Sequence, residues 1–360
     1  MTVSVPPVPR YVPAPTATEQ LDYADLPIVD LSKINTPEGK AELATTVRDA
    51  MKDKGFFYVI NHGLTPEQNE RIFNVANVPL DQVSDEEKMK FDGKLQQTGS
   101  YQGYKPRQYW HVDNGVRDQI EHYNMNKDLH RKGHPNALQP YLPELEEFIK
   151  YNHFNILHPL LRLLALGMNI DEETFIPLHN FDRVGETFLR FMKYHPRSED
   201  DEAKTKNVWL KGHTDFGTVS ILWSQPVVAL QILCPDEKWR YVNYIPNALV
   251  INAGDALEFL TGGFYRATIH RVVQPPESQR GYPRLGVFYF GMPDDDVKLS
   301  PLPDAPEWVD RRFKNEEAPT MGDYRKGRII AYGNSETKKV DGKETVEVQM
   351  IGNVLVKHYN

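Results

Sequence analysis

The chain contains the stretch Lys211-Gly212-His213-Thr214-Asp215-Phe216-Gly217-Thr218-Val219-Ser220-Ile221-Leu222-Trp223, in which a histidine and an aspartate stand two residues apart before an apolar, β-branched run. A β-strand directs residues i and i+2 to the same face, so the side chains of His213 and Asp215 can point into one cavity. His270 lies in another short β-rich run, at 267–273. Two histidines and one carboxylate from two strands can bind one face of an octahedral metal ion and leave its other positions open.

The region after about residue 185 consists of short β-rich runs separated by Gly, Pro and Asn, which is typical of an all-β sandwich or barrel. Eight such runs fit a double-sheet jelly roll. They span 187–194, 208–210, 218–223, 229–234, 239–243, 248–252, 267–273 and 284–290. We therefore expect a mainly β fold with flanking helices and a double-stranded β-helix, or jelly-roll, core.

The residues before this region predict a mixture of helices and strands. Five prolines between residues 1 and 24 indicate an extended arm on the surface. Hydrophobic periodicity and capping residues then indicate further elements. These are strands at 26–31 and 56–60, a helix at 36–54, a helix starting at Thr65, and a long helix at 143–170 that Pro159 is expected to kink.

Three regions follow from these patterns. Residues 1–180 form an N-terminal helical and strand region packed on the core, 181–295 form the jelly-roll core, and 296–360 form a C-terminal helical extension. In the extension we expect a helix at about 306–314 and a polar, mobile loop at 338–344.

Composition excludes several classes of function. The 360 residues carry a net charge of -8, so no general basic field attracts nucleic acid or an anionic membrane. The single cysteine, Cys234, excludes an internal disulfide and a zinc site built from several thiolates. Because no apolar run approaches a membrane span and no secretory signal is present, we expect a cytoplasmic protein.

Two other histidines invite a metal-binding interpretation that we do not favour. His62 follows a buried strand in a turn, where a lone histidine is more often structural. His111 and Asp113 repeat the two-residue spacing, but their surroundings indicate a loop without an apolar strand to hold them. We expect neither group to bind metal.

Taken together, these landmarks resemble the isopenicillin N synthase-like family of Fe(II)/2-oxoglutarate-dependent dioxygenases, and the resemblance covers nearly the whole chain. The matching segments are 26–32 and 55–63 in the N-terminal region, and His213-Thr214-Asp215, Asn252-Ala253-Gly254-Asp255 and Ile269-His270-Arg271-Val272 in the core. Their order and spacing make the match specific.

The resemblance implies a catalytic Fe(II) held by His213, Asp215 and His270, with 2-oxoglutarate chelating two open positions and O2 taking the last. It also implies that Arg284 grips the far carboxylate of 2-oxoglutarate, because a guanidinium matches a carboxylate bidentately. Gly286 stands where the family has a serine. We expect this loss of one hydrogen bond, about 1 kcal/mol net, to weaken co-substrate binding without abolishing it.

Tyr194 matches a family tyrosine that supports the same co-substrate. If it faces the cavity, strand alternation places Met192 and Arg190 there too. An inward Arg190 requires an anionic partner, either a substrate carboxylate or phenolate or a buried acid such as Glu258. Phe216 and Phe288 either wall the substrate pocket or pack in the core.

The expected activity is oxidation of a small, acidic or phenolic organic substrate, as in secondary metabolism, with release of succinate and CO2. Hydroxylation, desaturation and ring modification are all compatible with the ligand set. Gly286 keeps open an Fe(II) oxidase that needs no 2-oxoglutarate. A silent fold that serves as a small-molecule receptor is the third possibility, and it would consume neither O2 nor co-substrate.

Overall fold

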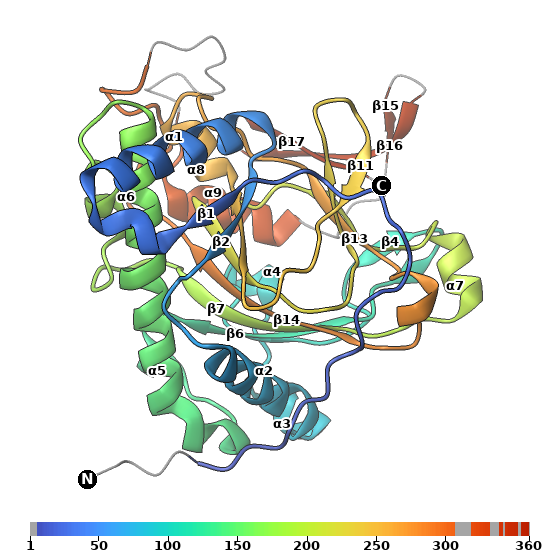
Figure 1. Cartoon of the computed structure of the whole chain (residues 1–360). Coiled ribbons are helices and arrows are strands. Elements are labelled where there is room, and N and C mark those ends of the chain that lie inside the picture. The colour runs from blue at the N-terminus through green and yellow to red at the C-terminus, as the bar shows by residue number, and fades with distance from the viewer. Residues whose placement is uncertain (1–5, 307–317, 332–337, 341–342, 352–353, 360) are drawn as a thin grey trace.

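The computed structural model describes residues 6–306, 318–331, 338–340, 343–351 and 354–359, and two large sheets dominate it (Figure 1). In the larger sheet the strand order is β1 (Ile28–Asp30), β2 (Phe56–Ile60), β12 (Leu249–Ala253), β9 (Val219–Trp223), β14 (Arg284–Gly291), β7 (Phe188–Tyr194), β6 (Ile120–Asn126) and β3 (Gly103–Lys105). In the smaller sheet it is β11 (Trp239–Tyr241), β10 (Leu230–Leu233), β13 (His270–Val273), β8 (Val208–His213), β17 (Val354–Tyr359), β16 (Lys343–Ile351) and β15 (Lys338–Val340).

The two sheets face each other and enclose a shared apolar interior. Met192 and Leu222 of the larger sheet pack in one cluster with Leu230, Ile232 and Val272 of the smaller sheet. Each of the eight β-rich runs predicted from sequence contains a strand, from β7 to β14. The jelly-roll prediction is therefore confirmed.

Helices cover the outer face of the larger sheet (Figure 1). They are α1 (Pro37–Asp53), α2 (Pro66–Asp81), α5 (Leu142–Tyr151) and α6 (His158–Gly167). Along β14, residues Leu285, Val287 and Tyr289 point to this side and are fully buried in the largest apolar cluster. The alternate residues point into the space between the sheets, because side chains alternate across a strand.

Local capping fixes where the helices begin. Thr36 accepts a hydrogen bond from the amide of Gly39, and Thr65 forms a reciprocal capping box with Gln68. The expected helix at 143–170 is present, but its irregularity lies before Pro159. A π-helical segment, Asn152–Leu157, joins α5 to α6 and leaves Pro159 in the first turn of α6, where a missing N–H is tolerated.

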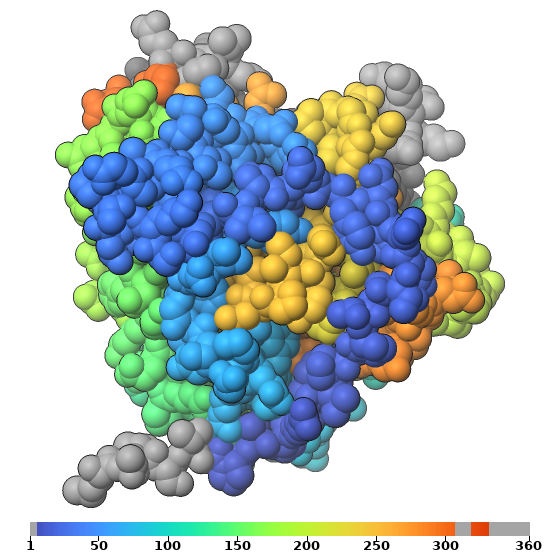
Figure 2. Space-filling view, viewed as in Figure 1, coloured from blue at the N-terminus to red at the C-terminus, as the bar shows by residue number. Residues whose placement is uncertain are grey.

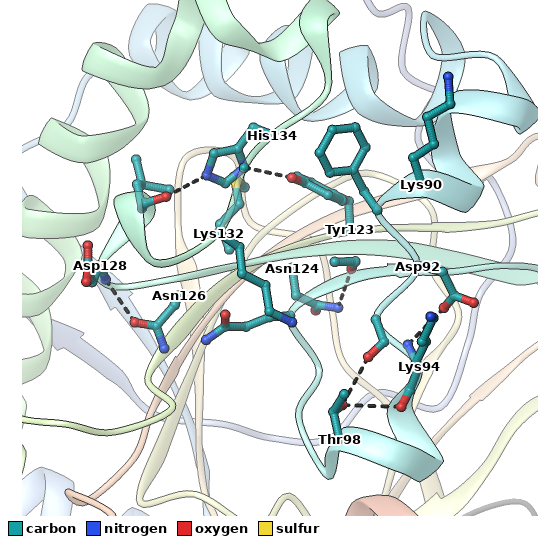
Figure 3. A pocket seen from close by; sticks show the side chains of 17 residues that line it. Lys90, Asp92, Lys94, Thr98, Tyr123, Asn124, Asn126, Asp128, Lys132 and His134 are labelled. Atoms are coloured by element: carbon teal, nitrogen blue, oxygen red, sulfur yellow. Dashed lines mark hydrogen bonds between the residues drawn. The ribbon is translucent and has the colours of Figure 1, made fainter.

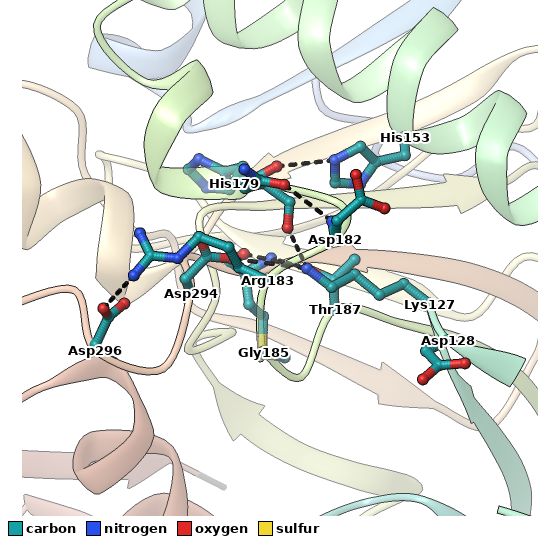
Figure 4. Close-up of polar contacts among 12 residues, drawn as sticks. Lys127, Asp128, His153, His179, Asp182, Arg183, Gly185, Thr187, Asp294 and Asp296 are labelled. Atoms are coloured by element: carbon teal, nitrogen blue, oxygen red, sulfur yellow. Dashed lines mark hydrogen bonds and ion pairs between the residues drawn. The ribbon is translucent and has the colours of Figure 1, made fainter. Parts of the chain in front are cut away.

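A buried polar network ties the π-helical segment to the strands. His153 donates from Nε2 to the carbonyl of His179 (Figure 4), and its Nδ1 lies 2.9 Å from the hydroxyl of Tyr289. His179 reaches Thr218 Oγ1 at 2.8 Å. Burial lowers the pKa of His153 to about 3 and that of His179 to about 4, so both are neutral. The network anchors the start of β9, next to the His213–Asp215 loop.

The C-terminal region differs from the expected helical extension. It contains a helix, α9 (Met321–Ala331), but Lys338–Val340 and Lys343–Ile351 are strands, and both overlap the stretch 338–344 for which a mobile loop was predicted. β17 pairs with β8 through Tyr359 and Gly212, so this ribbon completes an otherwise open sheet edge. That pairing partner is distant in sequence and gives no local signal. Most of the predicted helix at 306–314 lies outside the described residues.

The N-terminal arm lies extended over the surface, as the dark-blue segment of Figure 2 shows. The carboxylate of Glu19 accepts hydrogen bonds from Ser278, and Gln279 donates to the carbonyl of Pro15. No helix in the described residues is long and apolar enough to cross a membrane.

The burial of Val287 on the outer face of β14 can be tested by a matched pair of valine substitutions, one on this strand and one in an exposed loop. Val287→Ala removes buried methyl groups and is expected to lower the free energy of unfolding by about 2 kcal/mol. Val184→Ala makes the same change at a side chain that is 72% exposed and is expected to cost less than about 0.5 kcal/mol. Urea denaturation measures both. Equal effects would contradict the assignment of Val287 to the core.

Candidate metal centre and substrate pocket

The three predicted ligands meet at one end of the space between the sheets. His213 ends β8, His270 begins β13, and the two residues are direct partners in the antiparallel pairing of these strands. Asp215 Oδ1 lies 3.8 Å from Nε2 of each histidine. All three ligand atoms lie within 4.8 Å of one another, so a single ion can contact them all. Among the described residues this is the only group of His, Cys, Asp or Glu with that geometry.

Hydrogen bonds around the ligands prepare them for a cation. The Nδ1 atoms of His213 and His270 lie 2.8 and 3.1 Å from the carbonyls of Lys211 and Thr268. Each Nδ1 must therefore carry the proton, which leaves a lone pair on Nε2. Burial, and then the neighbouring His270, lower the pKa of His213 to about 3, so its neutral ligating form prevails. The donor set fits a divalent transition metal such as Fe(II).

Asp215 is oriented by its second oxygen. Asp215 Oδ2 accepts hydrogen bonds from Ser220 Oγ at 2.6 Å and from Asn252 Nδ2 at 2.8 Å, which turns Oδ1 toward the histidines. The backbone amide of Asp255 donates to the carbonyl of Asp215 at 2.7 Å. A Cβ on Gly254 would lie 2.3 Å from the carbonyl oxygen of Gly217, so this close approach requires glycine. The Asn252-Ala253-Gly254-Asp255 motif thus holds the ligand loop.

Arg328, in α9, is a site residue that the sequence did not reveal. Its Nη2 donates to the carbonyl of Thr214, between the two ligands, at 2.9 Å. Its Nη1 pairs with Asp255, which also accepts a hydrogen bond from Tyr324. Arg328 lies more than a hundred residues after the ligand loop and belongs to no motif, so only the fold brings the two together.

Arg284 begins β14 directly opposite Tyr194, and its guanidinium lies 5.2 Å from the Tyr194 ring. The residue is only 2% exposed, yet its Nε and Nη1 have no hydrogen-bond partner among the described residues. Burial lowers the pKa of Arg284, while Tyr194 acts in the opposite direction. A buried guanidinium without an anion is costly, so the arrangement fits an incoming carboxylate.

A cavity beside the metal ligands contains the predicted Arg190, Met192 and Phe216. Arg190 donates from Nε to Asn124 Oδ1 at 2.7 Å, and its Nη2 finds no partner within the described part of the chain. No hydrogen bond or ion pair joins Arg190 to Glu258 among the described residues, and the Glu258 carboxylate accepts a hydrogen bond from the amide of Ala267.

Aromatic rings enclose the Arg190 guanidinium. Its centre lies 4.5 Å from the Tyr101 ring and 4.9 Å from the Phe290 ring, and Phe216 stacks on Tyr101 at 5.9 Å. Tyr101 and Phe290 were not singled out from sequence. Phe290 could have been found by strand alternation from Phe288. Phe288 is half-buried and stacks on Phe290, with a ring separation of 5.7 Å.

The two other histidine groups lie apart from the metal centre. His62 is buried, and its Nε2 lies 2.9 Å from the carbonyl of Asn247. His111 is exposed. It belongs to a short hairpin of β4 (His111–Asp113) and β5 (Val116–Arg117), not to a loop as predicted. The hairpin places His111 opposite Arg117.

A second cavity, of about 440 Å³, lies at the edge of β6 (Figure 3). Lys90, Lys94 and Lys132 stand around it, and Tyr123 and His134 hydrogen-bond to each other at its wall. None of the metal ligands lines this cavity.

Comparison with known families agrees with this arrangement. The model of the 2OG-Fe(II) oxygenase superfamily matches residues 186–293, which include all three ligands and Arg284. The model described as the N-terminal region of non-haem dioxygenase in morphine synthesis matches residues 26–144.

Individual relatives extend the likeness over most of the chain. The 2-oxoglutarate-Fe(II) type oxidoreductase hxnY of Emericella nidulans is 28% identical and covers 76% of this chain and 82% of its own. Gibberellin 2-beta-dioxygenase 2 of Arabidopsis thaliana is 26% identical, and the match covers 89% of this chain and 91% of the relative. A full-length Neurospora crassa protein, crystallised in complex with alpha-KG and thymine, is 24% identical. The match covers 85% of this chain and 96% of the Neurospora chain, and its TM-score of 0.72 supports the fold.

Removing one ligand tests the metal centre. His213→Ala and Asp215→Ala are each expected to abolish stoichiometric Fe(II) binding in anaerobic titration, because two remaining ligands cannot hold a facial site. His111→Ala is the matched control and is expected to bind Fe(II) like the unmodified protein. Loss of iron in the control, or full binding in either ligand variant, would contradict the assignment.

Proposed function

We propose that this protein, which belongs to the 2OG-Fe(II) oxygenase superfamily, oxidises a small acidic or phenolic organic molecule and releases succinate and CO2. Its membership makes it an Fe(II)- and 2-oxoglutarate-dependent dioxygenase. The bound iron and co-substrate would supply the oxidising power for breaking a C–H bond. His213, Asp215 and His270 would hold the metal by the two Nε2 atoms and Oδ1. Ser220 and Asn252 would keep the carboxylate turned toward it.

Arg284 would bind the far carboxylate of 2-oxoglutarate. The observation that carries this proposal is a guanidinium that is almost fully buried and has two nitrogens without a hydrogen bond among the described residues. Tyr194, directly across the strand pair, would line the same pocket. A carboxylate bound there would neutralise the buried Arg284 guanidinium and accept hydrogen bonds from those two nitrogens.

Arg190 would recognise the substrate. Its Nη2, which has no partner among the described residues, is a donor in the cavity beside the metal, and the flanking rings favour a flat, anionic group such as an aromatic carboxylate or a phenolate. The crystallised Neurospora crassa protein contains thymine, which is also planar. Tyr101, Phe216 and Trp110 would exclude water from the reacting centre.

This proposal assigns a role to each region of the chain. Residues 181–295 would carry the metal and co-substrate sites. Residues 1–180 would support the larger sheet and contribute Tyr101 and Asn124 to the pocket. Residues 296–360 would fix the ligand loop through Arg328. The presence of all three proposed metal ligands also argues against a catalytically silent receptor.

The first experiment is an anaerobic titration of the Fe(II)-loaded protein with 2-oxoglutarate. Chelation of the metal is expected to produce a saturable visible charge-transfer band, and neither component alone should produce it. Bound iron without such a band would favour the Fe(II) oxidase that needs no 2-oxoglutarate. Succinate release under air, measured across a panel of aromatic acids and phenols, would then identify the substrate class.

Arg284 and Arg190 are expected to separate the two binding functions. Arg284→Ala should raise the KM for 2-oxoglutarate by about 10- to 100-fold, the effect of a lost charged hydrogen bond, and leave the KM for the organic substrate nearly unchanged. Arg190→Ala should show the reverse pattern. Steady-state kinetics with either reactant varied measures both. An equal rise in both KM values for either variant would contradict the assignment.

A further inference from the structure

Gly286 has an unusual neighbour for a residue in a central strand. A Cβ placed on Gly286 would lie 2.5 Å from Cε2 and 2.9 Å from Cζ of Phe288, closer than any ordinary carbon contact. The backbone at Gly286 does not have positive φ, so the obstacle is the aromatic ring alone. The Phe288 ring thus fills the space that a side chain at position 286 would take.

Phe288 and Gly286 share the inner face of β14 with Arg284 and Phe290, because residues two apart point the same way. Across the neighbouring strands, Phe288 is paired with Arg190 of β7 and Leu222 of β9. Phe290 lines the cavity beside the metal, and Arg284 begins the strand at the opposite end. Phe288 therefore stands between the proposed substrate and co-substrate pockets.

The ring is also held in place. Phe288 stacks on Phe290 with an interplanar angle of 14°, and it packs against two apolar clusters, one toward each end of the strand. Turning away from position 286 would break this stack. A side chain at position 286 would therefore compete with the ring directly.

We propose that Gly286 and Phe288 are a matched pair, in which the Phe288 ring replaces a side chain at position 286 and forms the floor of the 2-oxo acid pocket beside Arg284. This inference rests on the proposed function of Arg284. It makes Phe288 a determinant of co-substrate size, and it leaves Arg284 as the principal anchor of the far carboxylate. The packing then requires glycine at position 286, and the absence of a serine hydroxyl is not its main effect.

The two interpretations of Gly286 predict opposite results for Gly286→Ser. If the glycine only lacks a hydrogen bond, the serine should tighten 2-oxoglutarate binding by about fivefold. If the pair is matched, the serine should displace the ring, weaken 2-oxoglutarate binding by about tenfold or more, and lower the thermal unfolding midpoint of the metal-free protein by about 3 °C or more. Gly133→Ser is the control, since a Cβ there meets its nearest atom at an ordinary 3.7 Å.

A double-mutant cycle with Phe288→Ala tests whether the ring is the cause. In the Phe288→Ala background, adding Gly286→Ser is expected to cost neither thermal stability nor 2-oxoglutarate binding. If Gly286→Ser alone does not fold, comparing the double variant with Phe288→Ala still gives this answer. An equal loss in both backgrounds, or tighter binding by Gly286→Ser alone, would overturn the proposal.

The pocket floor is tested by anaerobic titration with 2-oxoadipate, which is one methylene longer than 2-oxoglutarate. Phe288→Ala is expected to raise the affinity for 2-oxoadipate relative to 2-oxoglutarate by about tenfold. An unchanged ratio would overturn the size-determining role. Failure of the unmodified Fe(II) protein to bind any 2-oxo acid would instead refute the proposed function, whereas unfolding of the metal-free variants reports on the packing of the pair independently.

Discussion

The antiparallel pairing of β8 with β13 is the constraint on which the rest of the site depends. It sets His213 directly opposite His270 at the end of the smaller sheet. Asp215 completes the group only because its loop is tied to the start of α8 (Asp255–Leu260) by the amide of Asp255 and to β12 by Asn252. The metal centre is thus a product of sheet register, and a shift of one residue in that register would turn a ligand away from the cavity.

Three buried arginines differ in whether the described residues neutralise their charge. Arg190, Arg284 and Arg328 are all buried, but they differ in how they are satisfied. Arg328 is neutralised by Asp255 and serves the architecture of the ligand loop. Arg190 and Arg284 have nitrogens without partners among the described residues, in an interior where an uncompensated charge costs several kcal/mol. An anionic ligand could offset this cost at Arg190 and Arg284, whereas Arg328 already has its carboxylate partner.

The flanking elements support the site from outside the jelly roll. The helices on the larger sheet bury the outer face of β14 and hold its inner face, with Arg284, Gly286 and Phe288, in register with β7 and β9. α9 reaches the ligand loop through Arg328 and also donates from Arg325 to the carbonyl of Gly99. That second contact lies two residues before Tyr101, one of the rings over Arg190. Helix α9 therefore links the loop of His213 and Asp215 to the wall of the cavity beside the metal ligands.

The sequence by itself determined the eight core strands, the capped helices and the family, and it selected the three proposed metal ligands, because each depends on local periodicity, on capping or on residues in a short motif. It also selected Arg284 by the family resemblance and Arg190 by strand alternation from Tyr194. Only the tertiary structure decided that Lys338–Val340 and Lys343–Ile351 are strands, that Arg328 holds the ligand loop, and that Phe288 fills the place of a side chain at Gly286. These features depend on contacts between distant segments or on the orientation of one ring, and neither leaves a periodic trace in the sequence.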